Sequence, residues 1–225
     1  MNIAIILAGG TGSRMSLDMP KQFAVVIDKP IMAYTLEVFN NSPLVDLIYL
    51  VSHKEYIEQS QRIINQFGLN KVKGIIEGGN TRQESVYNAL TKIPAKDDDI
   101  ILIHDCARPL VDQAIIEENV GACQQHDAVE TAVKATDTTI EVNNEAFESS
   151  LNRDKLYQVQ TPQTFTYKLI KEAHESARQN HLENTTDDAQ LVAKLGHKVF
   201  IVNGKKTNIK ITNDEDLKIF EALLK

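Results

Sequence analysis

Four short apolar runs along the chain predict buried strands. They occupy residues 3–7, 47–51, 100–103 and 199–202. Each run is too short for a typical helix, and unbroken apolar character is typical of strands that are covered on both faces in a parallel sheet. We therefore expect these four segments to lie inside a mostly parallel sheet.

Segments with helical spacing lie between these runs. In residues 81–93 the apolar positions recur at intervals of three and four, which places them on one face of a helix. Residues 57–67 and 185–195 show similar stripes, each followed by a glycine where helices commonly end. Asn213 can cap a last helix. This alternation predicts an α/β fold, with a mostly parallel twisted sheet and helices on both faces.

Residues 1–225 carry neither a linker composition nor an internal repeat, so we expect one domain. One stretch breaks the alternation: residues 138–147 hold two β-prone pieces around Asn143 and Asn144, which predicts a hairpin. A hairpin with few apolar residues is not stable alone. Two interpretations stay open: an arm over about residues 138–153 that docks on another subunit, or an edge hairpin of the parent sheet.

The composition narrows the class of protein. There are 24 Lys and Arg against 31 Asp and Glu, and the formal charge of −7 argues against a nucleic-acid binder. No apolar stretch approaches the ~20 residues of a membrane span, and the N-terminus lacks the basic region of a signal peptide. Cys106 and Cys123 fit neither a disulfide framework nor a zinc cluster. We expect a soluble cytoplasmic protein that binds neither nucleic acid nor a membrane.

The strongest local signal for chemistry is the glycine-rich turn after the first strand, Leu7-Ala8-Gly9-Gly10-Thr11-Gly12. Glycines let the backbone approach a ligand, so that successive N–H groups point at phosphate oxygens. The turn lacks the Gly-Lys-Ser/Thr of a Walker A loop, and Met15 stands where a dinucleotide-binding turn has its third glycine. A tight turn of purely structural use is the alternative.

Two cations follow this turn. Arg14 and Lys21 flank Pro20, which disfavours a continuous helix, so the segment can fold back over bound phosphates. Either cation alone would be read as a solvated surface charge. Together, on one phosphate-competent turn of an acidic protein, they predict a local anion site.

The third apolar run ends in His104, Asp105 and Arg108, at the edge where open α/β sheets bind ligands. Asp105 can hold Mg²⁺ or a ligand hydroxyl, and Arg108 can pair with a carboxylate or phosphate. A local Asp105–Arg108 ion pair is the alternative. We interpret His104 as a structural residue and Cys106 as a small packing residue.

Three further patches combine glycine or small polar residues with charge. Gly78, Gly79 and the residues after them could read a base or ribose, although helix capping by Asn80 or Thr81 explains them equally well. Thr186 is interpreted as a helix N-cap. Lys210 is expected on a strand, facing away from its apolar neighbours, and would be a second anion ligand if that face turns toward the cleft.

Seven motifs together resemble a known family. The chain carries, in this order, LAGGTGSRM–PKQF, GG–R–S, HD-ARP, DT, QTPQ-F, TDDA-LV and NIKIT–DL. This series is similar to the cytidylyltransferases that join CTP to a polyol phosphate. The resemblance implies a Rossmann-like nucleotidyltransferase fold, Mg²⁺-dependent release of pyrophosphate, and a homodimer with an exchanged β-arm.

The resemblance also implies the site residues. It implies a CTP site of Leu7, Ala8, Gly9, Gly10, Gly78, Gly79, Arg82 and Ser85, with Arg14 and Lys21 as the catalytic cations. It implies a polyol-phosphate site of Asp105, Arg108, Thr138, Arg153, Thr161, Thr186 and Lys210, in which Arg153 reaches the other subunit's substrate. Asp105 would also hold the metal.

The family has a methylerythritol phosphate branch and a ribitol phosphate branch. HD-ARP, GG–RQESVY and TDDAQLV resemble the first, whereas ILAGG and LYQVQTPQTF resemble the second. Ile140 stands where the first branch often has a lysine. More matching residues surround the substrate pocket in the first branch, so we expect methylerythritol phosphate. An NAD(P)-dependent oxidoreductase and a nucleotide-binding module without turnover are the rival classes.

Overall fold

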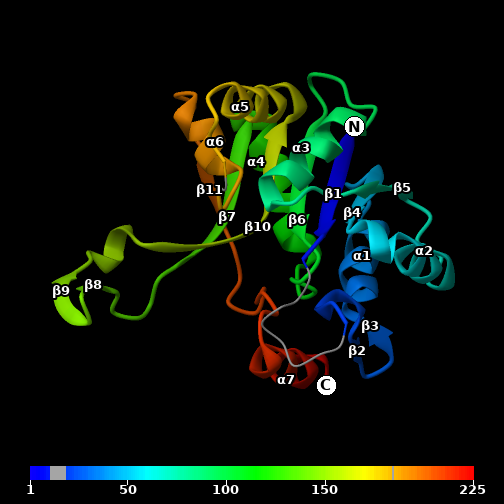
Figure 1. Cartoon of the computed structure of the whole chain (residues 1–225), viewed down its shortest axis with the longest axis horizontal. Helices are drawn as coiled ribbons and strands as arrows, with labels where there is room; N and C mark the ends of the chain where they lie inside the picture. The colour runs from blue at the N-terminus through cyan, green and yellow to red at the C-terminus, as the bar shows by residue number, and fades with distance from the viewer. Residues whose placement is uncertain (11–18, 184) are drawn as a thin grey trace.

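The computed structural model describes residues 1–10, 19–183 and 185–225, and this part of the chain is built on a seven-stranded sheet (Figure 1). The sheet order is β11-β7-β10-β6-β1-β4-β5. Its strands are β1 (Asn2–Ala8), β4 (Leu47–Ser52), β5 (Val72–Glu77), β6 (Ile100–Asp105), β7 (Ala128–Lys134), β10 (Tyr157–Thr166) and β11 (Phe200–Asn203). The short strands β2 (Val25–Val26) and β3 (Lys29–Pro30) pair separately.

The sheet is mostly parallel, which confirms the predicted fold class. β1 runs parallel to both β4 and β6, and β5 and β11 are parallel to their neighbours. β10 is antiparallel to β6 and β7. The runs at residues 3–7, 47–51 and 100–103 became β1, β4 and β6. The run at 199–202 became β11, but the prediction that it is covered on both faces is wrong, because β11 is the edge strand and is largely exposed.

Helices cover both faces of the sheet. They are α1 (Ile31–Asn41), α2 (Ile57–Gln66), α3 (Arg82–Lys92), α4 (Gln113–His126), α5 (Tyr167–Gln179), α6 (Ala189–Lys194) and α7 (Asp214–Leu224). Because strand side chains alternate, Ala4 and Ile6 of β1 pack in the core under α1, α2 and α4. Ile3 and Ile5 pack in the core under α3, α5 and α6. Within the described residues, every helix is too short or too polar to span a bilayer.

The helix ends follow their capping residues. The Thr81 side chain accepts a hydrogen bond from the Glu84 N–H and caps α3, and Asn213 caps α7 in a capping box with Asp216. The predicted helix over 185–195 begins only at Ala189. Thr186 is therefore not its N-cap, and its hydroxyl instead accepts a hydrogen bond from the Gln190 side chain.

The predicted hairpin is a projecting arm. β8 (Ile140–Asn143) pairs with β9 (Ala146–Ser150) in a two-stranded sheet of its own, which stands away from the main sheet in Figure 1. The turn residues Asn144 and Glu145 both have positive φ, as a tight two-residue hairpin turn requires. The interpretation as an edge hairpin of the parent sheet is wrong.

The C-terminal segment packs under the carboxyl end of the sheet. Ile211 and Phe220 are fully buried in a small core with Ala24, Val26 and Ile31. Lys210 precedes Ile211 in an irregular segment, so its expected place on a strand is wrong. The Ile211 N–H donates to the Ala107 carbonyl instead, which ties this segment to the loop after β6.

Candidate active site

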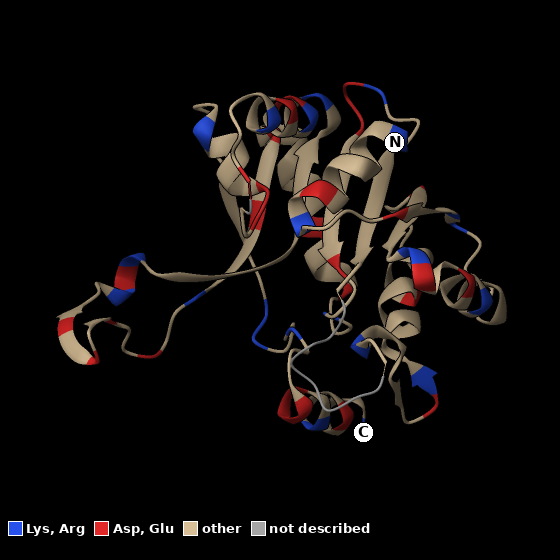
Figure 2. Cartoon of the chain, viewed as in Figure 1, with Lys and Arg blue, Asp and Glu red and all other residues tan. Residues whose placement is uncertain are grey.

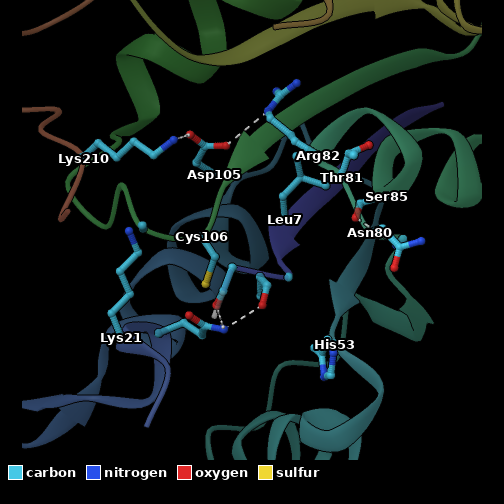
Figure 3. Close-up of a pocket in the computed structure, with 16 residues that line it drawn as sticks. Leu7, Lys21, His53, Asn80, Thr81, Arg82, Ser85, Asp105, Cys106 and Lys210 are labelled. Atoms are coloured by element: carbon cyan, nitrogen blue, oxygen red, sulfur yellow. Dashed lines mark hydrogen bonds and ion pairs between the residues drawn. The ribbon is translucent and has the colours of Figure 1, made fainter. Parts of the chain in front are cut away.

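A cavity of about 460 Å³ opens at the carboxyl ends of β1 and β6, beside the N-terminus of α3 (Figure 3). The predicted site residues that line it are Leu7, Ala8, Gly9, Gly10, Lys21, Gly79, Arg82, Ser85, Asp105 and Lys210. These come from both ends of the chain. Figure 2 shows basic positions along the segment between β11 and α7. This segment carries Lys210, which lines the cavity.

The glycine turn after β1 is held by Gln22. The buried Gln22 amide donates to the Ala8 carbonyl at 2.7 Å and to the Gly10 carbonyl at 3.1 Å. A Cβ at Gly9 would meet only Ser85 Oγ, at 3.8 Å, and a Cβ at Gly10 would meet no described atom within 4 Å. Packing among the described residues therefore does not demand these glycines.

Lys21 projects into the same cavity. It begins a short 3₁₀ turn after Pro20, and its Nζ donates to the Ile211 carbonyl at 2.6 Å. Lys21 thus contacts the residue that follows Lys210 in the chain, and the two lysines line one cavity. The other predicted catalytic cation, Arg14, lies outside the described residues.

Asp105, at the end of β6, is bracketed by two cations. Lys210 Nζ lies 2.7 Å from Oδ2 and Arg82 Nε lies 3.7 Å from Oδ1, on opposite sides of the carboxylate (Figure 3). Burial would raise the pKa of Asp105, but Lys210, Arg82 and Arg108 hold it well below its usual range. Asp105 is therefore ionised at neutral pH.

Arg108 has other partners than a local ion pair. Its guanidinium donates to the Asn208 carbonyl at 2.8 Å and to the Val159 carbonyl at 3.2 Å. These bonds join the loop after β6 to β10 and to the C-terminal segment. The alternative in which Asp105 and Arg108 only pair with each other is thus not what the geometry shows.

A second cavity of about 210 Å³ adjoins the first on the β10 side. Its lining includes Arg82, Asp105, Arg108, Thr161, Thr186 and Lys210. Arg82, Asp105 and Lys210 line both cavities. The Thr161 hydroxyl accepts a hydrogen bond from the Asp105 N–H at 3.1 Å and so fixes the end of β6. Arg82 therefore stands at the border of the two cavities.

The loop before α3 forms the opposite wall. The Gly79 N–H donates to Ser85 Oγ at 3.0 Å and the Asn80 N–H donates to Glu84 Oε2 at 2.7 Å. A Cβ at Gly79 would lie 2.3 Å from Glu84 Cγ, and one at Gly78 would lie 3.0 Å from Ser85 Oγ. A side chain at Gly79 would therefore force the first turn of α3 to shift, whereas at Gly78 the contact is tight only against the Ser85 hydroxyl.

Two predicted residues lie elsewhere. Thr138 precedes the arm and Arg153 follows it, where the Arg153 guanidinium donates to the Thr136 carbonyl at 3.1 Å. Neither residue lines the two cavities. Gly78 also lines neither cavity, although its neighbour Gly79 lines the larger one. Within one chain, the geometry gathers the other described site residues and leaves Thr138 and Arg153 apart.

His104 and Cys106 fit the structural interpretation. Burial lowers the pKa of His104 to about 4, so its ring is neutral, and it is hydrogen-bonded to the Arg108 carbonyl and the Thr161 hydroxyl. Burial raises the pKa of the Cys106 thiol to about 12. A thiol with so high a pKa is a poor nucleophile.

Sequence reasoning missed Gln22 and Asp188. Gln22 lies inside the PKQF motif, in which only Lys21 was predicted to be a site residue. Asp188 lies inside TDDA, and its Oδ2 is 2.7 Å from Arg82 Nη1. Both are polar residues that the fold buries. A polar residue inside a site motif was the available signal.

Glu130, on β7, gives a prediction about how the stability of the protein depends on pH. Burial and the nearby Asp187 raise its pKa to about 7. Between pH 4.5 and 7 the folded chain keeps a proton on Glu130 that the unfolded chain loses. The free energy of unfolding therefore falls as the pH rises over this range, and the fall is complete above about pH 7. The free energy of unfolding of Glu130→Gln and of the parent is measured with urea at pH 5 and pH 8. We expect the difference, variant minus parent, to be about 1–2 kcal/mol larger at pH 8 than at pH 5. A pH-independent difference, like that expected for exposed Glu172→Gln, would contradict this.

The fold and the cavities together define a Rossmann-like nucleotidyltransferase. A glycine turn follows the first central strand, and cations and one carboxylate line the carboxyl edge of a mostly parallel sheet. The model of the family IspD, 2-C-methyl-D-erythritol 4-phosphate cytidylyltransferase, matches residues 2–225, and the chain belongs to this family.

Individual relatives agree with the family model. A protein of Clostridium tetani (strain Massachusetts / E88) named 2-C-methyl-D-erythritol 4-phosphate cytidylyltransferase is 46% identical over 226 residues, which cover 100% of this chain and 90% of the relative. A protein of the same name from Geotalea uraniireducens (strain Rf4) is 41% identical over 99% of this chain and 96% of its own. The crystal structure of the 4-diphosphocytidyl-2C-methyl-D-erythritol synthase from Anaerococcus prevotii DSM 20548 superposes with a TM-score of 0.86 at 28% identity, covering 100% of this chain and 98% of that one.

Proposed function

We propose that this protein transfers CMP from CTP to 2-C-methyl-D-erythritol 4-phosphate, releasing pyrophosphate and forming 4-diphosphocytidyl-2-C-methyl-D-erythritol. The observation that carries the proposal is the pair of adjoining cavities that share Arg82, Asp105 and Lys210. A reaction between two phosphorylated substrates needs two anion sites that meet. The relatives named above support methylerythritol phosphate over ribitol phosphate as the acceptor.

The larger cavity would take CTP. Its phosphates would lie against the glycine turn held by Gln22, with Lys21 beside them and the base toward the loop at Gly79 and Ser85. The smaller cavity, with Arg108, Thr161, Thr186 and Lys210, would take the polyol phosphate. This arrangement would direct the acceptor phosphate toward the α-phosphorus of CTP.

The chemistry follows from charge. A phosphate monoester is largely a dianion near neutral pH, since its second pKa is ~6, so its oxygen needs no general base. It would attack the α-phosphorus in line while the bond to pyrophosphate breaks. The barrier lies in bringing anions together and in the charge on the transferring phosphoryl oxygens, which Lys21 and the backbone N–H groups would stabilise.

Asp105 fits a divalent cation. Mg²⁺ is commonly held by one or two carboxylates together with substrate phosphates, and Asp105 is an ionised carboxylate that borders both cavities. The part of the chain that the structure describes holds no cluster of three or more metal-binding side chains, so the nucleotide phosphates would complete the coordination. Bound there, Mg²⁺ would neutralise phosphate charge.

The arm supports a homodimer. Its apolar residues Ile140, Val142 and Phe147 are exposed, with 44–65% of each accessible. A two-stranded hairpin is marginal in water, so another subunit would cover this face, and Arg153 would then reach the polyol phosphate there. Sedimentation analysis tests the dimer. CTP is a cytoplasmic nucleotide, so we place the reaction in the cytoplasm.

Pyrophosphate release tests the function directly. The protein is incubated with CTP, Mg²⁺ and either 2-C-methyl-D-erythritol 4-phosphate or ribitol 5-phosphate, and kcat/KM is compared. We expect a preference of about 10²-fold or more for the methylerythritol substrate, since a hydrogen-bonding site can reject an analogue that lacks the group it binds by as much as about 10⁴–10⁵-fold. A preference for ribitol 5-phosphate would reassign the acceptor. If the protein bound CTP but released no pyrophosphate with either acceptor, it would be a nucleotide-binding module and not an enzyme.

A further inference from the structure

A buried acid–histidine pair stands behind Arg82. Asp188 Oδ2 lies 2.7 Å from Arg82 Nη1, and Asp188 Oδ1 lies 2.9 Å from His174 Nε2. The Asp188 and His174 side chains are each only 1% exposed, whereas Arg82 is 23% exposed and faces the cavities. Of the two carboxylate oxygens of Asp188, Oδ2 faces the cavity residue Arg82 and Oδ1 faces the buried His174.

An amide adds a third support. Gln163 Oε1 accepts a hydrogen bond from the Asp188 N–H at 3.1 Å and one from Arg82 Nη2 at 3.4 Å. The Gln163 amide nitrogen in turn donates to Glu130 Oε1. Residues of α5, β10 and the segment before α6 thus converge on a guanidinium from α3.

This network fixes the orientation of Arg82. A guanidinium is a planar fork. Its Nε and Nη1 form ion pairs with Asp105 and Asp188, and its Nη2 donates to Gln163, so three contacts in different directions hold its plane. Burial would lower the pKa of Arg82, but Asp188 and then Asp105 raise it. Burying charged groups is costly even when they are paired, and replacing a buried ion pair by apolar side chains of similar volume often leaves a protein equally stable. Stability alone therefore gives no reason for Asp188 to be buried here. The buried pair is explained by what it does to Arg82.

We propose that Asp188, held by His174, is a positioning residue that fixes Arg82 at the border of the two cavities. Arg82 there steadies Asp105 on the side opposite Lys210, where the polyol phosphate would enter. This inference rests on the proposed function. It assigns Asp188 an effect on the acceptor substrate that is exerted through Arg82, whose guanidinium the Asp188 carboxylate contacts.

The test is a comparison of steady-state constants for Asp188→Asn with those of the parent enzyme. Loss of a charged partner predicts a rise of about tenfold in KM for 2-C-methyl-D-erythritol 4-phosphate. Because Arg82 also lines the larger cavity, KM for CTP should rise in the same variant. Glu175→Gln, a matched change on an exposed residue beside His174, should alter neither. A purely structural role would lower the melting temperature and leave both KM values of the folded enzyme unchanged, which would overturn the proposal.

A double-mutant cycle shows whether Asp188 acts through Arg82. In an Arg82→Met background, Asp188→Asn should add less than about twofold to KM for the polyol phosphate, because the charged group that Asp188 positions is gone. If the two substitutions instead multiplied each other's effects on this KM, Asp188 would act independently of Arg82, and the proposal would be overturned. If Asp188→Asn does not fold, His174→Gln keeps the carboxylate and changes only its support. A rise in the same KM then supports the proposal, and an unchanged KM overturns it. An inactive parent enzyme would refute the proposed function instead.

Discussion

Replacement of Lys21 by alanine is expected to lower kcat for pyrophosphate release by about 10²-fold or more, the usual scale for one preorganised charge donor. Lys21 lies beside the glycine turn, and its Nζ is directed by the Ile211 carbonyl at 2.6 Å. Negative charge grows on the phosphoryl oxygens only in the transition state, so the effect should appear in kcat more than in KM for CTP.

The control for this variant is Lys29→Ala. Lys29 is a nearby lysine that pairs with Glu37 at 2.7 Å and lies outside both cavities. We expect it to retain parental kcat. If Lys21→Ala also kept a near-normal kcat, Lys21 would have no part in the mechanism.

Asp105→Asn is expected to reduce kcat/KM by about 10²–10³-fold. The substitution keeps the size of the side chain and removes the charge that holds Lys210 and Arg82 on opposite sides of one carboxylate. It also removes the expected metal ligand, so additional Mg²⁺ should restore little activity. The measurement is the initial rate of pyrophosphate release across a Mg²⁺ series, with circular dichroism to verify folding.

The matched control is Asp98→Asn. Asp98 is exposed and lies just before the opposite end of β6, so it undergoes the same chemical change far from the cavities. Its kcat/KM should be unchanged. Full activity of Asp105→Asn at ordinary Mg²⁺ would show that this carboxylate neither binds the metal nor organises the cations.

Hydrophobic pattern identified the centre of the sheet but not its antiparallel strand. β1, β4 and β6 are unbroken apolar runs, and such runs are typical of strands covered on both faces. β10 was missed because it buries polar residues that no periodicity reveals. Its Thr164 hydroxyl donates to Asn119 Oδ1, and the Thr131 hydroxyl donates to the Pro162 carbonyl. Those partners are distant in the sequence, so only the folded chain shows that the strand is central.

The same limit applied to the site. The motifs named Lys21, Asp105 and Lys210 as substrate-site residues, and the folded chain brings all three to the lining of one cavity. Their roles there stay predictions. The motifs could not show that Asp188 is buried against Arg82 and His174, because that depends on how α3, α5 and α6 pack. The assignment of Arg82 to the CTP site stays a prediction, and the geometry adds that Arg82 also borders the second cavity.

A crystal structure with CTP and Mg²⁺ tests the central claim most directly. The account requires the triphosphate to lie against Gly9 and Gly10, with Lys21 Nζ moved within hydrogen-bonding distance of a phosphate oxygen. A triphosphate bound outside this cavity, with Lys21 still on the Ile211 carbonyl, would contradict it.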